Sequence, residues 1–207
     1  MPRPLHPAIA RPAGLALVAA ASLVLLCACT PEVGQPTASA APPTASAPPT
    51  TEPAAEPTET PEPPIPFAIG CDELLTAEQL YAFNPNFGTD PGYQPSAAAI
   101  VTILEEDAGT ACGYLNQTSG EVIEIGVATP APRMGEARRD AAAMSSHAVP
   151  TYGTPPEVEG YFSERGGTGE AQVFSGPYWI VMSSPALFEP GDAQQLVTAV
   201  LGNLPAA

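Results

Sequence analysis

The sequence predicts an α+β domain in which an antiparallel sheet of about five strands is packed by helices on one face and held by one disulfide. Three observations predict it. Segments with β character follow one another without the regular helical crossovers that a parallel sheet requires. Segments with helical periodicity lie before, between and after them. Residues 67–207, which we take as the single folded domain, hold only two cysteines.

Two helices are expected first. Thr76 and Gln79 have capping-box spacing, which predicts a short helix over 76–83. Residues 84–95 contain three prolines and two glycines and are expected to form a loop. The alanine-rich segment 96–107 favours a second helix, although its apolar centre also suits a strand.

A hairpin and a long helix follow. Segments 110–117 and 121–129 are rich in β-forming residues and flank a Thr-Ser-Gly turn, so they are expected to pair. Residues 132–147 begin with a proline and carry apolar residues at helical spacing.

The end of the domain is predicted to contain three antiparallel strands and a closing helix. Residues 148–157 hold three prolines and are expected to be loop, and glycine-containing turns separate the strands after them. Asp192 is expected to cap the last helix, which has an apolar face. The three predicted strands are 160–165, 170–175 and 178–183.

Cys71 and Cys112 are predicted to form the disulfide, because two cysteines outside the cytoplasm normally pair. A zinc site is the competing use of cysteine. It needs about four ligands, and this domain offers two cysteines and one histidine without ligand-like spacing. We therefore predict no metal and no cofactor.

Residues 1–28 have the pattern of a signal peptide. Arg3 and Arg11 precede an apolar run over 13–26, which is too short to span a bilayer comfortably. The run ends in Leu-Cys-Ala-Cys and resembles a bacterial lipobox, which implies that Cys29 is lipidated after cleavage. An ordinary secretory peptide with a free thiol at Cys29 is the alternative.

Residues 29–66 are predicted to be a lipid-anchored, disordered linker rich in proline, threonine, alanine and serine. Residues 31–66 contain 12 prolines and almost no large apolar side chains, so they cannot bury enough surface to offset their ordering entropy. We expect a semi-rigid stalk that lifts the domain off the outer face of the cell membrane.

The charge excludes a nucleic-acid partner. The chain has 22 acidic residues, six arginines and no lysine, whereas a nucleic-acid-binding surface needs cations to replace phosphate counterions. Attachment to an anionic leaflet would therefore depend on the lipid and not on charge.

A search for catalytic patterns finds none. His147 is the only histidine beyond residue 28, and a solvated helix end explains the acidic cluster at 105–107 better than a metal site does. The glycine-rich segment 166–169 is predicted to be a hairpin turn. Four acidic residues of the second half are candidates for glycoside hydrolysis by number alone: Glu157, Glu159, Glu164 and Glu170.

Aromatic residues concentrate in the second half of the domain. Tyr152, Tyr161, Tyr178 and Trp179 are predicted as a possible binding surface, because tyrosine and tryptophan combine contact area with a polar group. Burial of all these rings by the domain's own helices and loops is the alternative.

The order of these parts resembles that of small actinobacterial cell-envelope lipoproteins of unknown function. The resemblance rests on Cys71 before the first helix, on the Cys112-Gly113-Tyr114 step that opens a hairpin, and on the Tyr178-Trp179 strand before the closing helix. It implies an envelope location and an accessory role, and it supplies no catalytic residues.

We therefore expect a membrane-anchored, extracytoplasmic lipoprotein whose non-catalytic domain binds an envelope protein or a small ligand. The alternatives are a cell-wall or glycan hydrolase that uses acidic residues and a small single-lobe solute-binding accessory protein.

Overall fold

The computed structural model describes residues 62–206. The predicted signal peptide, Cys29 and all but the last five residues of the predicted linker lie outside this part of the chain. No helix among the described residues has the length and the apolar character needed to cross a bilayer.

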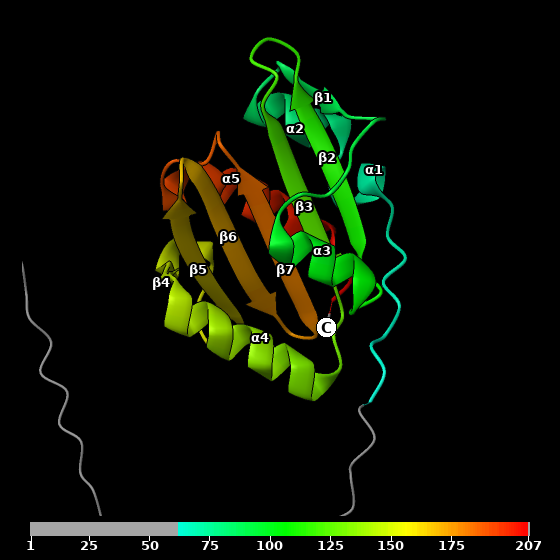
Figure 1. Cartoon of the computed structure of the whole chain (residues 1–207), viewed down its shortest axis with the longest axis vertical. Coiled ribbons are helices and arrows are strands. Elements are labelled where there is room, and N and C mark those ends of the chain that lie inside the picture. Colours follow the sequence, from blue (N-terminus) through cyan, green and yellow to red (C-terminus); the bar gives the residue numbers. More distant parts are fainter. Residues whose placement is uncertain (1–61, 207) are drawn as a thin grey trace, which may run out of the picture. The chain divides into compact units, whose positions relative to one another are not determined.

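The α+β class and the antiparallel sheet are confirmed. Residues 62–206 form a seven-stranded sheet with the order β1-β2-β3-β7-β6-β5-β4, in which every neighbouring pair is antiparallel, and five α-helices (Figure 1). The helices are α1 (Cys71–Leu74), α2 (Ala77–Phe83), α3 (Ala98–Glu105), α4 (Pro132–Ser145) and α5 (Pro190–Asn203). The strands are β1 (Phe87–Thr89), β2 (Thr110–Asn116), β3 (Val122–Ala128), β4 (His147–Ala148), β5 (Val158–Arg165), β6 (Thr168–Ser175) and β7 (Tyr178–Ser184).

The five predicted strands correspond to the five long strands, and the sheet has two more than expected. The additional strands are β1 and β4, which have three and two residues and lie at the two edges. Strands this short leave no alternation in the sequence, so they were not predicted. The helix predicted over 132–147 ends at Ser145, and His147 begins β4.

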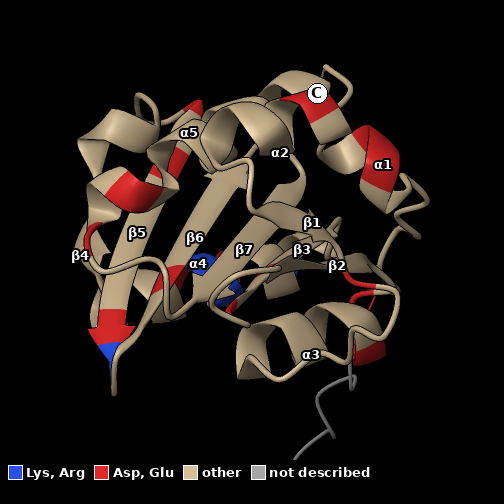
Figure 2. Ribbon diagram, turned by 90° about the horizontal axis from the view of Figure 1, so that it is seen from above, with Lys and Arg blue, Asp and Glu red and all other residues tan. Residues whose placement is uncertain are grey.

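Helices cover both faces of the sheet, which corrects the expectation of one covered face. Figure 2 shows α1, α2 and α5 on one side of the sheet and α3 on the other. The buried apolar residues form two separate clusters, one on each face of the sheet. Leu196 and Val200 of α5 belong to the first cluster. Ile100 and Ile103 of α3 belong to the second, together with Ala142 of α4.

The reason lies in the central strands, which are apolar on both faces. In β7, Ile180 and Met182 point into the α5 cluster, and Trp179 and Val181 point into the α3/α4 cluster. A strand that is apolar at nearly every position must be covered on both faces. Gly126 of β3 lets α3 approach closely, because a Cβ there would lie 2.8 Å from the Ile103 side chain.

The helix starts follow local hydrogen bonds. The predicted capping box of α2 is confirmed: the Gln79 amide donates to the Thr76 hydroxyl at 3.2 Å, and the Thr76 amide donates to the Gln79 side chain at 2.9 Å. Helix α5 begins two residues before the predicted cap. Glu189 is its N-cap, and Asp192 acts from the third helical position by accepting from the Glu189 amide at 3.0 Å.

The Cys71–Cys112 disulfide is confirmed, with the two Cα atoms 5.6 Å apart. It joins the first residue of α1 to β2 across 41 residues of chain. The hydroxyl of Tyr114, also on β2, donates to the Cys71 carbonyl at 3.1 Å. The disulfide therefore fixes α1 to the sheet beside the first apolar cluster.

Replacing both Cys71 and Cys112 with serine should lower the free energy of unfolding by about 4 kcal/mol, because the unfolded chain regains the freedom of a long loop. Urea denaturation of the oxidised wild type and of the double variant measures the difference. Equal midpoints with equal slopes would contradict a stabilising role for the bond.

Candidate functional site

A polar groove lies at the end of the sheet formed by the β2–β3 turn, the start of β6 and the end of β7. Its cavity volume is about 540 Å³, within the range of ligand sites. Hydroxyl groups dominate the polar lining. They belong to Ser96, Ser119, Thr168, Ser183 and Ser184, and Glu121 and Glu124 supply two carboxylates.

Glu124 of β3 is buried without a cation beside it among the residues that the structure describes. It is 7% exposed and accepts hydrogen bonds from the Tyr93 hydroxyl at 2.9 Å and from the Ser96 amide at 2.8 Å. It also accepts from the Ser96 hydroxyl and, at 3.4 Å, from the Ala97 amide, just before α3. Burial, and then the hydrogen bond to Glu124, raise the pKa of Tyr93, so the phenol remains a donor.

Ser183 of β7 has an acidic residue opposite it on each of the two neighbouring strands. It pairs with Glu124 on one side and with Glu170 of β6 on the other, so the three side chains share the α3/α4 face. Ser183 is 6% exposed, and its hydroxyl makes no hydrogen bond within residues 62–206. The hydroxyl lines the groove, where water or a ligand can reach it.

The chain enters the domain at the opposite end of the same strands. The Ile65 amide donates to the Thr129 carbonyl at 3.1 Å, next to the last residue of β3, and the Phe67 amide donates to the Ala108 carbonyl at 3.0 Å. The groove adjoins the first residue of β3. Seven strand residues separate the two ends, a distance of about 20 Å.

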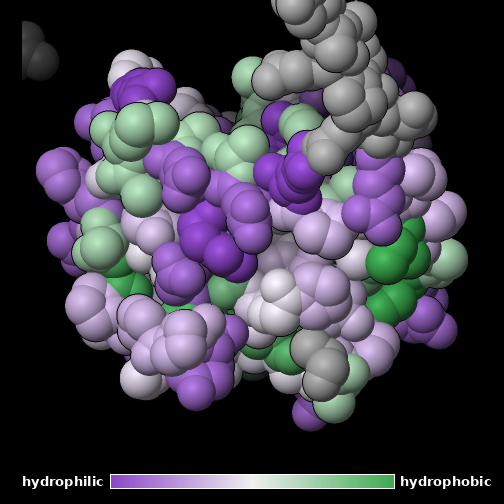
Figure 3. Space-filling model, turned by 90° about the horizontal axis from the view of Figure 1, so that it is seen from below, coloured by the Kyte–Doolittle hydropathy of each residue, from purple (hydrophilic) through white to green (hydrophobic). Residues whose placement is uncertain are grey.

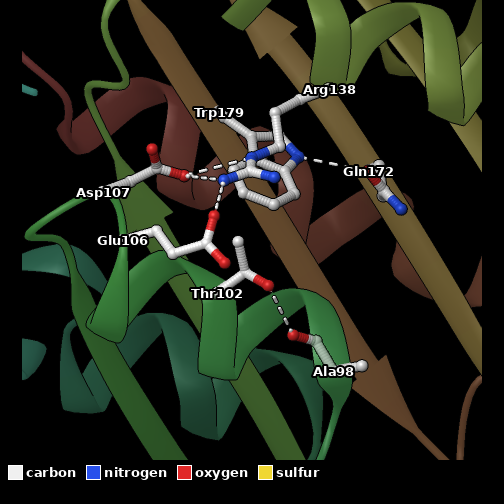
Figure 4. Close-up of polar contacts among 7 residues, drawn as sticks. All are labelled: Ala98, Thr102, Glu106, Asp107, Arg138, Gln172 and Trp179. Carbon is white, nitrogen blue, oxygen red and sulfur yellow. Dashed lines mark hydrogen bonds and ion pairs between the residues drawn. The ribbon is translucent and has the colours of Figure 1, made fainter. Parts of the chain in front are cut away.

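The other end of the α3/α4 face is closed by a second polar cluster around Arg138 of α4. The guanidinium carbon of Arg138 lies 5.1 Å from the centre of the Trp179 ring, and two carboxylates of the α3 end flank the guanidinium (Figure 4). The nearest N–O distances are 2.8 Å to Glu106 and 3.1 Å to Asp107. Arg138 thus ties α4 to α3 across the β7 strand.

Trp179 extends this cluster toward the groove. Its indole N–H donates to the Gln172 side chain at 3.1 Å, and the Gln172 amide donates to Glu170 at 2.7 Å. Glu170 is the register partner of Ser183. A continuous set of polar contacts therefore connects the Arg138 cluster to the strand row that forms the groove floor.

Arg139, the next residue of α4, makes a parallel but looser set of contacts. Its guanidinium carbon lies 5.5 Å from the Phe174 ring, and its nearest distance to Glu159 is 3.5 Å. The Tyr161 hydroxyl donates to the same Glu159 at 2.9 Å. Figure 3 views the domain from below, toward α4, and strongly hydrophilic side chains gather in the middle of that face.

The four aromatic residues predicted as a binding surface do not lie on one surface. Tyr161 and Trp179 both pack near Phe174 in the α3/α4 cluster, and Trp179 is only 3% exposed. Tyr152 is buried in the opposite cluster, where its hydroxyl donates to the Pro190 carbonyl at 2.7 Å. Tyr178 packs against that same cluster with its ring edge-on to Phe67. The structure thus brings two of the four together and leaves the other two on the far face.

The acidic residues singled out in the sequence have different roles. Of the cluster at 105–107, Asp107 is buried and paired with Arg138, which corrects its interpretation as part of a solvated helix end. Glu159 and Glu170 are held by the contacts above. Glu164 accepts from the Gly167 amide at 2.7 Å and closes the β5–β6 turn, and Glu157 is exposed. Among the described residues, no group of three or more histidine, cysteine or acidic side chains could hold a metal ion.

The remaining surface has other hollows and scattered apolar side chains. One hollow, of about 530 Å³, lies between α2 and α5 and is lined largely by glutamine and small residues. The large exposed apolar residues belong to separate segments, and Met134 and Met144 are about 15 Å apart along α4. Scattered apolar residues of this kind are normal for a protein surface.

The groove was not predicted, although one signal for it was present. Glu124 is the one acidic residue in the otherwise apolar strand Val122–Ala128. A carboxylate in a buried strand needs hydrogen-bond partners from other parts of the chain. The partners, at Tyr93 and Ser96, come from a loop whose position the sequence does not reveal. In the comparisons with known proteins, no family model, no curated protein and no solved structure matches this chain.

Replacing Arg138 with glutamine should lower the free energy of unfolding at pH 7 by about 3 kcal/mol, because Asp107 is left charged and buried. Burial raises the pKa of Asp107 above its usual 3.8, and Arg138 opposes that rise. Without Arg138 the pKa rises further. The deficit should therefore be small near pH 3, where Asp107 is protonated. It should grow as the pH rises through the wild type's folded pKa and level off above the variant's higher folded pKa.

Urea denaturation at pH 3 and at pH 7 measures this difference. Arg139→Gln is the matched control, because Arg139 also stacks on an aromatic ring but makes a more exposed ion pair, and it should cost less than about 1 kcal/mol. A deficit of Arg138→Gln that did not depend on pH would show that Asp107 is not its cause.

Proposed function

We propose that this chain is a lipid-anchored, extracytoplasmic binding protein and that the groove at Ser183 and Glu124 is its ligand site. The observation that carries the proposal is the Ser183 hydroxyl, which stands on a strand paired on both sides, lines a cavity of about 540 Å³ and makes no hydrogen bond within residues 62–206. A polar group that is held on a rigid strand at a cavity can bond to a ligand without first losing a protein partner.

The envelope location is supported by the sequence and by the disulfide. The sequence begins with a positively charged segment, which is followed by an apolar core and then by Cys29. Bacterial lipoprotein precursors have these parts in the same order. The Cys71–Cys112 bond is typical of proteins that fold outside the cytoplasm.

The position of the groove fits a tethered binding protein. The linker joins the domain beside Thr129, and the groove lies about 20 Å away at the other end of β3. The linker therefore attaches at the end of β3 that lacks the groove, so its attachment does not cover the groove. The groove would remain open to molecules of the envelope, and the acidic composition would not draw the domain onto an anionic leaflet.

A small ligand fits the domain better than the two alternatives. The exposed apolar residues are scattered, which does not favour a protein partner bound through a large apolar patch. A glycan hydrolase needs a carboxyl group that exchanges protons with the substrate. Glu124 is poorly suited to this task, because its two oxygens already accept four hydrogen bonds.

The anchor is tested with two neighbouring cysteines. Cells that express the wild type should incorporate radioactive palmitate into the protein and retain it in the membrane fraction. Cys29→Ala should lose the label and appear in the medium, because two or more acyl chains are needed for stable anchoring. Cys27→Ala is the matched control and should behave as the wild type. Label that persists in Cys29→Ala would contradict the proposed lipidation site.

The ligand site is tested with two tryptophan substitutions in the secreted Cys29→Ala chain. We expect at least one compound from a panel of saccharides, amino acids and polyamines to raise the melting temperature. Ser119→Trp, at the groove rim, should abolish the shift, whereas Thr198→Trp, in the hollow between α2 and α5, should retain it. A shift lost only in Thr198→Trp would place the site elsewhere, and no shift with any compound would count against the proposed function.

A further inference from the structure

We propose that the groove binds a neutral, polyhydroxylated ligand, namely a saccharide of one or two rings. This inference rests on the proposed function and specifies its ligand. It follows from three properties of the lining: the kind of polar group, the sign of the charge and the volume.

The first property is the predominance of hydroxyl groups. Hydroxyls donate and accept hydrogen bonds, as the hydroxyls of a sugar do, and the two sets are therefore complementary. Ser183 and Thr168 make no side-chain hydrogen bond within the described residues 62–206, so both remain available to a ligand. Ser184 accepts from the Ala186 amide at 3.0 Å and keeps its hydroxyl proton for a further acceptor.

The second property is a negative charge without a cation in the lining. Glu121 and Glu124 border the groove, and no arginine or histidine does so. An anionic ligand, such as a phosphate ester or an acidic sugar, would meet two carboxylates and no counter-ion. A polyamine would gain less than the charge suggests, because the Glu124 oxygens are occupied by four donors and Glu121 already accepts from the Ser119 hydroxyl at 2.7 Å.

The third property is a fixed floor of suitable size. A cavity of about 540 Å³ lies within the range of small-ligand sites and exceeds what a single ordered water would fill. The floor is rigid, because Ser183 lies on the central strand β7 and is paired on both sides in the sheet. A preorganised row of polar groups loses little entropy on binding.

Isothermal titration calorimetry of the secreted Cys29→Ala chain tests the ligand class. The probes are an array of neutral mono- and disaccharides, the corresponding uronic acids and sugar phosphates, and spermidine. We expect at least one neutral saccharide to bind and the acidic forms of that sugar to bind at least tenfold more weakly. Ser183→Ala should weaken the neutral ligand roughly 3- to 10-fold, the effect of one lost hydrogen bond.

Two variants separate this inference from the proposed function. Ser119→Trp should abolish binding, and Thr198→Ala, outside the groove, should leave the affinity unchanged. Spermidine or an acidic sugar that bound in a Ser119→Trp-sensitive manner, without any neutral saccharide, would overturn the ligand class and leave the groove as the site. Neutral saccharides that bound equally well to Ser119→Trp would overturn the assignment of this ligand to the groove. Absence of binding by every probe would count against both.

Discussion

The antiparallel pair of β3 and β7 lies at the centre of the sheet and is covered on both faces, and the remaining elements are placed by this requirement. Ile125 and Ile180 need the cover of α5 on one face, whereas Trp179 and Val181 need α3 and α4 on the other. Helices α1, α2 and α5 pack on the first face, and helices α3 and α4 pack on the second. The Cys71–Cys112 disulfide fixes only α1, so the central strands and not the covalent bond decide the arrangement of the layers.

The α3/α4 face changes character along β7, and this change creates the groove. Its side chains read Trp179, Val181 and Ser183 from one end to the other. At the Trp179 end, Arg138 bridges α4 and the end of α3 and closes the face. At the Ser183 end no helix bridges the described elements, and the lining is formed by turns and hydroxyl groups. A strand that is apolar at one end and polar at the other thus provides a core and a solvent-accessible hollow on one surface.

The sequence predicted those helices and strands whose pattern depends only on residues close together in the chain. The alternation of Ile123, Ile125 and Val127 predicted a strand, and the Thr76 and Gln79 spacing predicted a helix start, because each depends on neighbours along the chain. The two-sided cover, the short edge strands and the groove depend on which elements meet in space. Ser183 and Glu124 lie 59 residues apart in the chain and are adjacent only through the β3–β7 pairing. No local pattern encodes that neighbourhood.

The distribution of arginine explains why the groove remains negative in so acidic a domain. Four arginines lie within residues 62–206: Arg133, Arg138 and Arg139 are on α4, and Arg165 donates to the Ser145 carbonyl at the end of α4 at 3.0 Å. Helix α4 buries only one residue, Ala142, so its apolar contribution to packing is small and ionic and cation–π contacts must supply the rest. Arg138, Arg139 and Arg165 are used to hold α4 in place, and no arginine lines the groove beside Glu121 and Glu124. The contacts that close one end of the α3/α4 face therefore also determine the charge at the other, and with it the kind of ligand that the groove can accept.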